Sequence, residues 1–443
     1  MNGGRSIFIG RAPGRLDLMG GNDDYTGGLV FEATIREATW AVVELRDDRH
    51  IVFHNPQMAE HGRGCRAEFL LDDLTRAEEV RRLANQDPAL RWTAYVLGAF
   101  FLLKARFPDR VTRGADVFIT SDVPLNKGVS SSAAVEVAVM KTAARAYGID
   151  MAGVELAEAC QWSENFIAES ACGIMDQIAV VLGDEGYILP LVCQPCEPRA
   201  LVKLPDELRC WAVDSGVSHA VTGLEYESAR AAAFMGYKLI CDWEGLEPQP
   251  DESGAVPRWV DPIWNGYLAN IPPSVFRSRY EARLPEELTG AEYLELAKLH
   301  VDPFTQARPE AVYRIRANTR YAVEENARVC LFSELARGGT GFVEMGELMF
   351  QSHWAYSECG LGNEVTDLLV ELVRQAGAEN GLYGAKVTGG GAGGTVAVLG
   401  HKDAEDIFRR VVASFGERRG FTPYVFEGSS AGADRFGVQE FRL

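Results

Sequence analysis

The segment PLNKGVSSSAA, residues 124–134, decides the fold of this chain. It places Gly128 and three serines, Ser130–Ser132, directly before an alanine-rich apolar stretch that runs to about Tyr147. A Gly/Ser turn that opens a helix offers free backbone N–H groups and the positive end of the helix dipole, which together suit a phosphate. The segment therefore predicts a phosphate-binding loop at the start of a helix.

Two further segments extend this prediction. Residues 386–395 read KVTGGGAGGT, a glycine cluster through which backbone can approach a ligand closely. Residues 11–28 read RAPGRLDLMGGNDDYTGG, a loop that mixes acidic and basic side chains. A phosphate cradle, a glycine-rich wall and such a loop together indicate a kinase for a small molecule.

Two familiar nucleotide motifs were compared with the chain. It has no GxxxxGK[ST], so it is not a P-loop protein. Residues 389–394, GGGAGG, fit GxGxxG as text, but the next residues, Thr395–Leu399, are strand-like where a dinucleotide-binding turn needs a helix. The HRD and DFG motifs of protein kinases are absent as well.

Composition limits the class of protein. The chain of 443 residues has 44 basic and 63 acidic residues, a formal net charge of −19. This charge disfavours nucleic acid and anionic membranes as partners. The longest apolar run, Ala94–Leu103, is about half of a bilayer span, and the first ten residues do not resemble a secretory signal. We read Cys193 and Cys196 as ordinary thiols rather than a metal or redox pair, and expect a cytoplasmic monomer or weak homodimer.

The order of elements favours an α+β fold, because strands and helices are mixed without regular alternation. We expect two domains, 1–209 and 210–443, with an insertion at about 247–299 in the second. Ser6–Arg11 is predicted to be a strand that ends at a Pro-Gly turn, and Leu29–Ile35 and Thr39–Leu45 to be two separate strands. Residues 247–262 are expected to be an exposed loop, and Tyr424–Glu427 the last strand.

The three segments, in their order and spacing, resemble the GHMP small-molecule kinase superfamily. Arg11–Gly28 is similar to the galactokinase signature, and so are residues 172–177 (CGIMDQ) and 346–353 (GELMFQSH). Within the superfamily the nearest resemblance is to the L-arabinokinase kinase domain, and it is carried by residues 11–21, 266–284, 356–362 and 426–430.

The resemblance implies a two-domain fold with the active site between the domains. The N-terminal domain would be like domain 2 of ribosomal protein S5, and the C-terminal domain a ferredoxin-like α/β sandwich. It also implies an ATP- and Mg²⁺-dependent sugar-1-kinase that phosphorylates the anomeric hydroxyl of a galacto-configured sugar.

The same resemblance assigns roles to residues of this chain. Asp176 and Arg15 would flank the anomeric hydroxyl, with Asp176 either accepting its proton or only orienting it. Ser131 or Ser132, with Glu164, would hold Mg²⁺. The nucleotide would be bound by Gly128, Val129, Ser130, Ser131, Ser132 and Ala133, with Trp92 and Tyr95 as candidates for the adenine wall. The sugar would be bound by Gly21, Asn22, Asp24, Gly173, Asp176, Tyr226, Gly390 and Gly391.

Substrate choice depends on one departure from galactokinases, which have Glu-His where this chain has Gly21 and Asn22. In galactokinases that pair contacts the 6-hydroxyl, and L-arabinopyranose is galacto-configured without the hydroxymethyl group. L-arabinose is therefore the expected substrate. D-galactose, L-fucose and a non-catalytic sugar and ATP sensor remain as alternatives.

Each assigned residue also has a purely structural interpretation. Asp24 could form an Asx turn, the serines could be helix N-caps, and Glu164 could lie on a solvated helix face. Arg15 and Asp176 could be a structural ion pair, and Trp92 and Tyr95 could belong to the core. His353 is expected to be a core or capping histidine.

Overall fold

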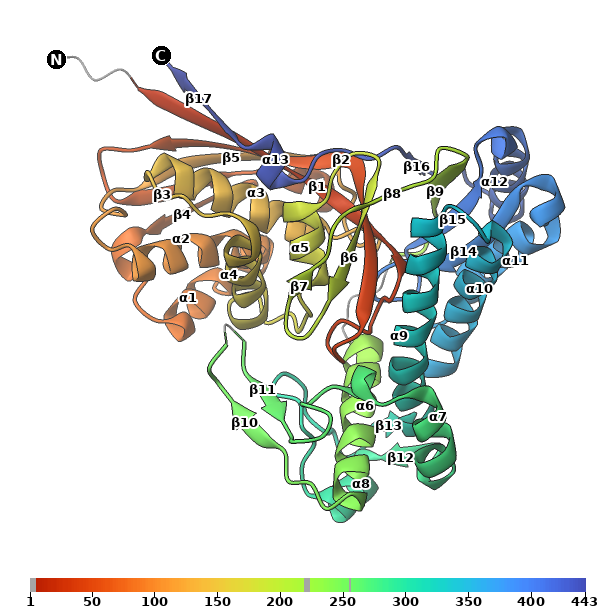
Figure 1. Ribbon diagram of the computed structural model, residues 1–443. Helices are drawn as coiled ribbons and strands as arrows, with labels where there is room; N and C mark the ends of the chain where they lie inside the picture. Colours follow the sequence, from red (N-terminus) through yellow and green to blue (C-terminus); the bar gives the residue numbers. More distant parts are fainter. Residues whose placement is uncertain (1–4, 219–223, 255) are drawn as a thin grey trace.

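The computed structural model, which describes residues 5–218, 224–254 and 256–443, contains two main β-sheets with helices packed against them (Figure 1). Most strand pairs are antiparallel, and β3 with β5 is a parallel pair. The mixture confirms the predicted α+β class.

The first sheet is built around two long strands, β1 and β2. Its main path runs β17-β1-β2-β5-β3-β4, and β6 pairs with β2 as well as with β7 and β8. Its strands are β1 (Ser6–Met19), β2 (Leu29–Leu45), β3 (His50–His54), β4 (Arg66–Leu70), β5 (Ala115–Ser121), β6 (Tyr187–Val192), β7 (Glu197–Pro198), β8 (Val202–Lys203) and β17 (Val438–Arg442).

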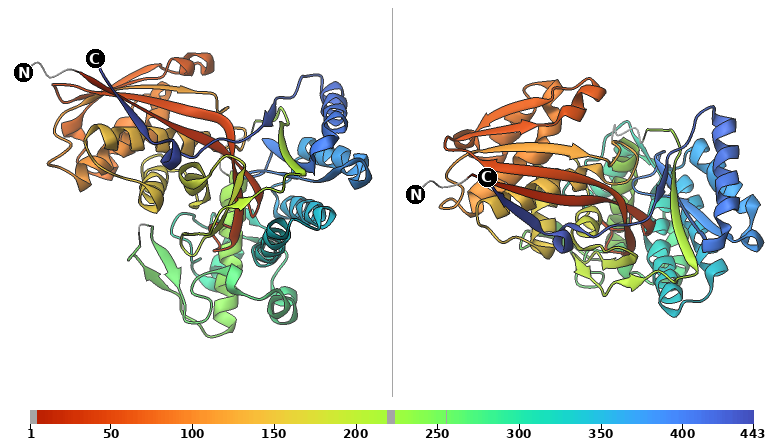
Figure 2. Two further views of the ribbon diagram at one scale, coloured as in Figure 1. Left: turned by 45° about the horizontal axis from the view of Figure 1, so that its top comes forward. Right: turned by 90° about the horizontal axis from the view of Figure 1, so that it is seen from above.

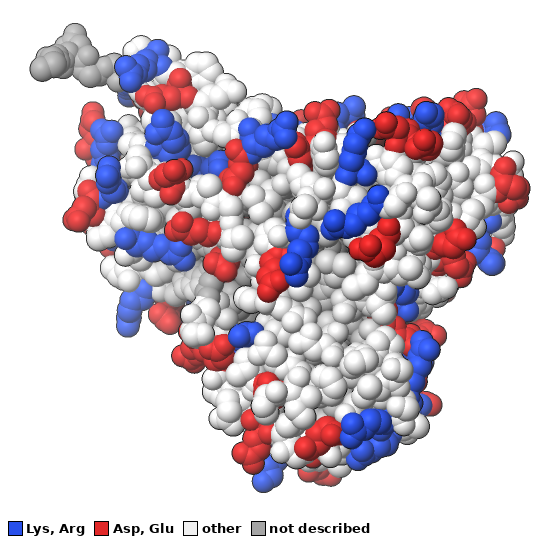
Figure 3. Space-filling model, in the orientation of Figure 1, with Lys and Arg blue, Asp and Glu red and all other residues white. Residues whose placement is uncertain are grey.

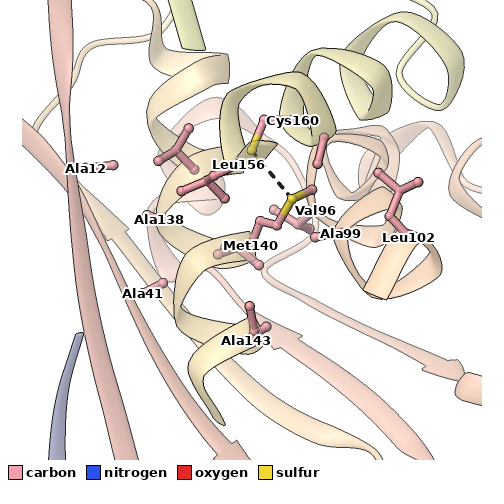
Figure 4. Packing of buried hydrophobic residues seen from close by; sticks show 14 of the residues in the cluster. Ala12, Ala41, Val96, Ala99, Leu102, Ala138, Met140, Ala143, Leu156 and Cys160 are labelled. Atoms are coloured by element: carbon pink, nitrogen blue, oxygen red, sulfur yellow. Dashed lines mark hydrogen bonds between the residues drawn. The ribbon is translucent and has the colours of Figure 1, made fainter. Parts of the chain in front are cut away.

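Helices cover one face of this sheet. They are α1 (Ala77–Ala84), α2 (Ala94–Arg106), α3 (Ser131–Ala146), α4 (Gly153–Phe166) and α5 (Met175–Leu182). Small side chains let α3 lie close to the strands: Ala12 and Ala41 of the sheet pack near Ala138 of α3, and Met140 contacts Cys160 of α4 at 3.7 Å between the sulfur atoms (Figure 4). The serine segment therefore opens a helix fixed in a dense core.

The predicted turn at Pro13-Gly14 and the predicted break within residues 29–45 are both wrong. β1 continues through Pro13 with an irregularity in its pairing between Pro13 and Arg15, and β2 is one strand of 17 residues. A β-bulge lets a strand absorb such a residue without ending. β2 pairs with β1 and β6 before the expected gap and with β1 and β5 after it, and the strand continues between these two paired stretches.

The second sheet has the order β14-β15-β9-β16. Helices α11 and α12 pack on it, while α9 and α10 contact both this sheet and the ends of β1 and β2, where Phe31 meets Phe332. The strands are β9 (Leu208–Asp214), β14 (Leu382–Val387), β15 (Thr395–His401) and β16 (Val425–Glu427), and the helices are α9 (Ile315–Gly338), α10 (Phe342–Cys359), α11 (Glu364–Ala376) and α12 (Glu405–Arg419).

A lower lobe forms around α6 (Leu224–Trp243), which packs along α9 (Figure 1). The expected loop at 247–262 instead contains a hairpin of β10 (Gln249–Asp251) and β11 (Arg258–Val260), so that expectation is wrong in part. Residue 255 of the predicted insertion lies outside the described residues. The lobe also contains α7 (Pro273–Val275), β12 (Leu288–Thr289), α8 (Gly290–Ala297) and β13 (Val312–Tyr313).

The chain returns to the first sheet at its C-terminal end. After β16 come α13 (Ala433–Phe436) and β17, which pairs antiparallel with β1, so the N- and C-terminal segments lie side by side (Figure 2). The expectation that Tyr424–Glu427 is the last strand is therefore wrong. The division at residue 209 remains a prediction; that residue falls within β9.

Acidic and basic side chains are interspersed on the face shown in Figure 3. Among the residues that the structure describes, no helix is long and apolar enough to cross a membrane.

Candidate active site

A cleft of about 1110 Å³ opens where the two sheets and the lower lobe meet. It brings together segments that are distant in the sequence. Its lining includes Asn22 and Asp24 of the β1–β2 turn, residues 124–128 and 130–132, residues 168–173, Met175, Asp176, the start of α6, and Gly390 and Ala392. The side chain of Val129 is buried away from it.

Two backbone loops meet at the centre of the cleft: the serine loop (residues 124–130) and the glycine loop (residues 388–394). A Cβ atom on Gly389 would approach the carbonyl oxygen of Gly128 to 2.8 Å, and one on Gly394 would approach that of Lys127 to 2.9 Å. Both glycines have positive φ angles, which other residues rarely adopt. The glycine cluster therefore serves the contact between the two loops in addition to bordering the cleft.

Arg15 and Asp176 form the ion pair on which the sequence analysis centred. The Nε and Nη2 atoms of Arg15 donate to Oδ1 of Asp176 at 2.8 and 2.6 Å, and Nη1 donates to the carbonyl of Gly128 at 2.7 Å. Burial disfavours the charged guanidinium, but Asp176, Glu32 and Asp17 outweigh it and raise the pKa of Arg15. Asp176 stays 21% exposed toward the cleft, so its carboxylate is held and still accessible.

Ser130 holds the other oxygen of the same carboxylate. Its hydroxyl donates to Oδ2 of Asp176 and makes no capping bond to helix α3, so the N-cap interpretation of this serine is wrong. The backbone of Ser130 is left-handed, with φ of 57°. The serine loop thus turns back on Asp176 before α3 begins.

Ser131 and Ser132 begin α3 and line the cleft together with Glu164 of α4. Glu164 is 5% exposed, which contradicts the solvated-face interpretation. It accepts a hydrogen bond from Gln177 Nε2 at 2.7 Å and interacts with the Ser132 hydroxyl. Burial, followed by repulsion from Asp176, raises the pKa of Glu164 to about 7.

These oxygen atoms fit a magnesium ion in their chemistry, because Mg²⁺ prefers hard oxygen ligands and keeps several of its waters. Among the described residues, no group of three or more His, Cys, Asp or Glu could hold a metal. A divalent ion at Ser132 and Glu164 would therefore depend on further oxygens from a phosphate ligand.

The β1–β2 turn supplies Asn22 and Asp24 to the cleft. Asp24 accepts from the backbone N–H of Tyr25 at 2.9 Å, and Gly173 lies so close that a Cβ there would meet the Asp24 carboxylate at 1.7 Å. Burial, followed by repulsion from Asp176, raises the pKa of Asp24 to about 6. Tyr226 of α6 completes this side of the cleft and contacts Tyr25 edge to face.

Gly21 has no space for a side chain. A Cβ atom there would lie 2.3 Å from both Asp17 Oδ2 and the hydroxyl of Tyr356. Tyr321 donates to the Gly21 carbonyl at 2.6 Å, and Tyr356 donates to that of Gly389 at 2.9 Å. Tyr321 therefore bonds to the turn itself, while Tyr356 packs beside Gly21 and bonds to the glycine loop. Asn22 rather than Gly21 faces the cleft.

Trp92 and Tyr95 also line the cleft, at the end where α2 begins. Trp92 is only 6% exposed, and its indole N–H donates to the carbonyl of Gly64 at 2.9 Å. Gly390 lines the cleft as well, whereas a Cβ on Gly391 would meet Leu361 and Tyr356. His353 is fully buried and bonded to Asp367, as expected of a core histidine.

A buried ion pair that was not predicted from the sequence lies beside this site. Lys386 of β14 donates to Asp17 of β1 at 2.6 Å, and both side chains are fully buried. A lysine three residues before the glycine cluster, in an otherwise apolar strand, was the available signal. Glu32 of β2, also buried, lies in the same group and was missed because it sits in a strand of ordinary appearance.

Comparison with known families gives three matches along the chain. Residues 94–184 match the model for the GHMP kinases N terminal domain, and residues 331–418 match GHMP kinases C terminal. Residues 2–45, which contain the β1–β2 turn, match the galactokinase galactose-binding signature. The matches cover the serine loop, helix α10 and the turn.

Curated relatives agree with these matches. An L-arabinokinase of Arabidopsis thaliana is 34% identical over 98% of this chain, which spans about half (47%) of that protein. A galactokinase of Chloroflexus aggregans is 31% identical, with 94% of this chain and 89% of that protein covered.

Solved structures share the fold. A Lactococcus lactis galactokinase complexed with galactose superposes with a TM-score of 0.76 at 22% identity, with 99% of this chain and 95% of that chain covered. A mevalonate kinase superposes with a TM-score of 0.57 at 13% identity, with 96% and 99% covered.

Proposed function

Because the chain belongs to the GHMP kinase family and is an ATP-dependent, galactokinase-like sugar kinase, we propose that it phosphorylates the anomeric hydroxyl of a galacto-configured monosaccharide, with L-arabinose as the substrate. The product is L-arabinose 1-phosphate. The observation that carries the proposal is the exposed Asp176 carboxylate, held by Arg15 and Ser130 between the serine loop and Asp24.

The transfer uses Asp176 and Arg15 as its catalytic residues. The anomeric oxygen bonds to the γ-phosphorus while the bond from that phosphorus to the β–γ bridging oxygen breaks, and ADP leaves with the electron pair. Asp176 orients the hydroxyl and takes its proton as the oxygen attacks. Because Arg15 and Ser130 already bond to both oxygens of the Asp176 carboxylate, a loose transition state in which Asp176 mainly positions the hydroxyl suits this geometry.

ATP binds at the serine loop. The residues Gly128, Val129, Ser130, Ser131, Ser132 and Ala133 surround the phosphates with backbone N–H groups and the positive end of α3. Trp92 and Tyr95 border the adenine; since the indole N–H of Trp92 is already bonded, its contribution is a ring face. Ser132 or Ser131, with Glu164, would hold Mg²⁺, which when bound neutralises charge on the transferring phosphate.

The sugar binds between the β1–β2 turn and the glycine loop. Asp24, Asn22, Gly173 and Tyr226 surround it on one side, and Gly21, Gly390 and Gly391 shape the backbone around it. Residue 21 is a glycine and offers no carboxylate to a 6-hydroxyl. Asp17 and Tyr356 fill the space that a side chain at this position would need. A pentose without that hydroxyl leaves no polar partner unsatisfied here.

D-galactose is the second candidate substrate, because the chain also matches galactokinases and nothing in the cleft is assigned to reject a hydroxymethyl group. A non-catalytic sensor would be expected to have lost part of the pair or the serine loop, and Arg15, Asp176 and Ser130–Ser132 are all present. We further propose a cytoplasmic enzyme that acts as a monomer or weak homodimer.

A coupled ADP-release assay with Mg-ATP tests the proposal. L-arabinose, D-galactose, L-fucose and D-galacturonate are each titrated to obtain kcat/KM, and phosphorus NMR identifies the phosphorylated position. L-arabinose is expected to have the highest kcat/KM and an anomeric phosphate. A higher value for galactose would overturn the pentose assignment but keep the reaction. ATP binding without turnover of any of the four sugars would favour the sensor.

Asp176→Asn provides the matched negative control for that assay. It keeps the size of the side chain but removes the carboxylate, so turnover is expected to fall by roughly 10²–10⁴-fold with ATP affinity nearly unchanged. Substantial remaining turnover would remove Asp176 from the mechanism.

A further inference from the structure

Glu32 is a buried carboxyl group directly beneath the Arg15–Asp176 pair. It lies on β2 opposite Asp17 of β1, and its side chain is 0% exposed. Its Oε2 atom is 3.4 Å from Arg15 Nε, yet neither carboxyl oxygen has a hydrogen-bond partner. Buried polar groups are almost always bonded, so this group requires an explanation.

The charges around Glu32 do not balance if all of them are ionised. Three carboxyl groups, Asp17, Glu32 and Asp176, meet two cations, Arg15 and Lys386, in one buried group. Arg15 bonds to Asp176 and Gly128, and Lys386 bonds to Asp17, so neither cation donates a hydrogen bond to Glu32. Glu32 is therefore the carboxyl group of the three that has no hydrogen bond on either oxygen.

An ionised carboxylate without hydrogen bonds is costly in such a place, and protonation removes the cost. Burial, with added repulsion from Asp17, raises the pKa of Glu32 well above its ordinary value, although Arg15 opposes the shift. The groups that face it are Arg15 and Asp17 from β1, Asp176 from α5 and Lys386 from β14. One proton on Glu32 makes the group of five neutral.

We propose that Glu32 is a positioning residue which stays protonated in the active enzyme and so leaves Arg15 entirely to Asp176. When Glu32 loses its proton, its carboxylate competes for the Nε–H of Arg15, which lies 2.8 Å from Asp176 and 3.4 Å from Glu32. The Arg15 guanidinium then bonds to both Glu32 and Asp176. It orients Asp176 less well and stabilises the negative charge on the attacking oxygen less. This inference rests on the proposed kinase function.

The pH dependence of kcat distinguishes this role from a purely structural one. Glu32→Gln keeps the shape of the protonated acid but cannot ionise. Each profile of kcat against pH is normalised to its own maximum. We expect wild-type kcat to fall at basic pH, and the kcat of the variant to fall only at a pH about one unit or more higher. An identical basic limb in both proteins would overturn the proposal.

Glu37→Gln is the matched control. Glu37 lies on the same strand, is also buried and also has an unbonded oxygen, but it contacts Tyr424 and Arg36 rather than Arg15. It is expected to keep the wild-type basic limb. A shift equal to that of Glu32→Gln would show that the effect is general to β2 and would overturn the assignment.

Infrared difference spectroscopy of the sugar-free protein tests the proton itself. The spectrum of wild type minus Glu32→Gln is expected to contain the carbonyl band of a protonated carboxyl group at neutral pH, lost at high pH. Absence of that band would overturn the proposal whether or not the protein is active. A kinase assay without turnover, together with the band, would instead refute the proposed function alone.

Discussion

Arg15 donates two hydrogen bonds to a single oxygen of Asp176, from Nε at 2.8 Å and Nη2 at 2.6 Å, and leaves the second oxygen to Ser130. The remaining guanidinium nitrogen, Nη1, donates to the carbonyl oxygen of Gly128 at 2.7 Å. Arginine alone has donors in this fork arrangement. The carboxylate and the serine loop are thus held in register by one side chain.

The first prediction concerns this fork. Arg15→Lys keeps the charge but cannot bond to Asp176 and Gly128 together, so kcat is expected to fall by roughly 10²-fold while the KM for ATP changes little. Steady-state kinetics measure the change. A kcat near the wild-type value would mean that charge alone suffices and that the fork geometry is incidental.

The second prediction concerns Asp24, whose pKa is raised to about 6. Its protonated form has lost the negative charge and accepts hydrogen bonds from sugar hydroxyls more weakly, so the apparent KM for the sugar is expected to rise as pH falls below about 6, by up to about tenfold per pH unit. The measurement is the KM for sugar between pH 5 and pH 8.

Protonation of Asp24 is expected to weaken sugar binding but to favour the folded state of the protein. Because the pKa is higher in the folded protein than in the unfolded chain, stability from this group is present below the ordinary pKa and is lost as pH rises to about 6. Asp24→Asn should remove that part of the pH dependence of unfolding and raise the KM at every pH. A KM that is independent of pH in the wild type would contradict the prediction for binding, and the same pH dependence of unfolding in both proteins would contradict the prediction for stability.

The third prediction concerns Glu164. Glu164→Gln keeps the hydrogen bonding with Ser132 possible but removes the anionic ligand, so the Mg²⁺ concentration for half-maximal rate should rise by roughly tenfold or more. Glu155→Gln, on the exposed side of the same helix, is the control and should leave it unchanged. Equal Mg²⁺ requirements in both variants would exclude Glu164 as a ligand.

The fourth prediction concerns Gly21. Gly21→Ala places a methyl group against Asp17 and Tyr356, so the free energy of unfolding should fall by about 1–3 kcal/mol. Gly338→Ala, where a Cβ would meet its nearest neighbour only at 3.5 Å, is the control and should change stability little. Chemical denaturation measures both. For the same reason, a Glu-His pair at residues 21 and 22 should destabilise the turn unless Tyr356 is also changed.

The local sequence pattern predicted several elements of the fold and of the cleft, but it failed where pairing between distant strands decides the structure. The serine loop, the helix that follows it and the strand after the glycine cluster follow from turn residues and periodicity, and the order of these segments pointed to residues that line the cleft. The continuation of β1 through Pro13 could not be predicted, because pairing with β2 on a bulge overrides the local turn signal. Glu32 and Lys386 were missed since their meaning depends on strands joined only in three dimensions.

The pairing of β17 with β1 has a consequence for how the chain is made. Residues 6–10 of β1 have an open outer edge until residues 438–442 have been synthesised, although β1 and β2 come much earlier in the chain than β17. An unpaired edge is a template for pairing with other chains. During synthesis, residues 6–10 are therefore open to pairing with other chains until the strand that covers them has emerged.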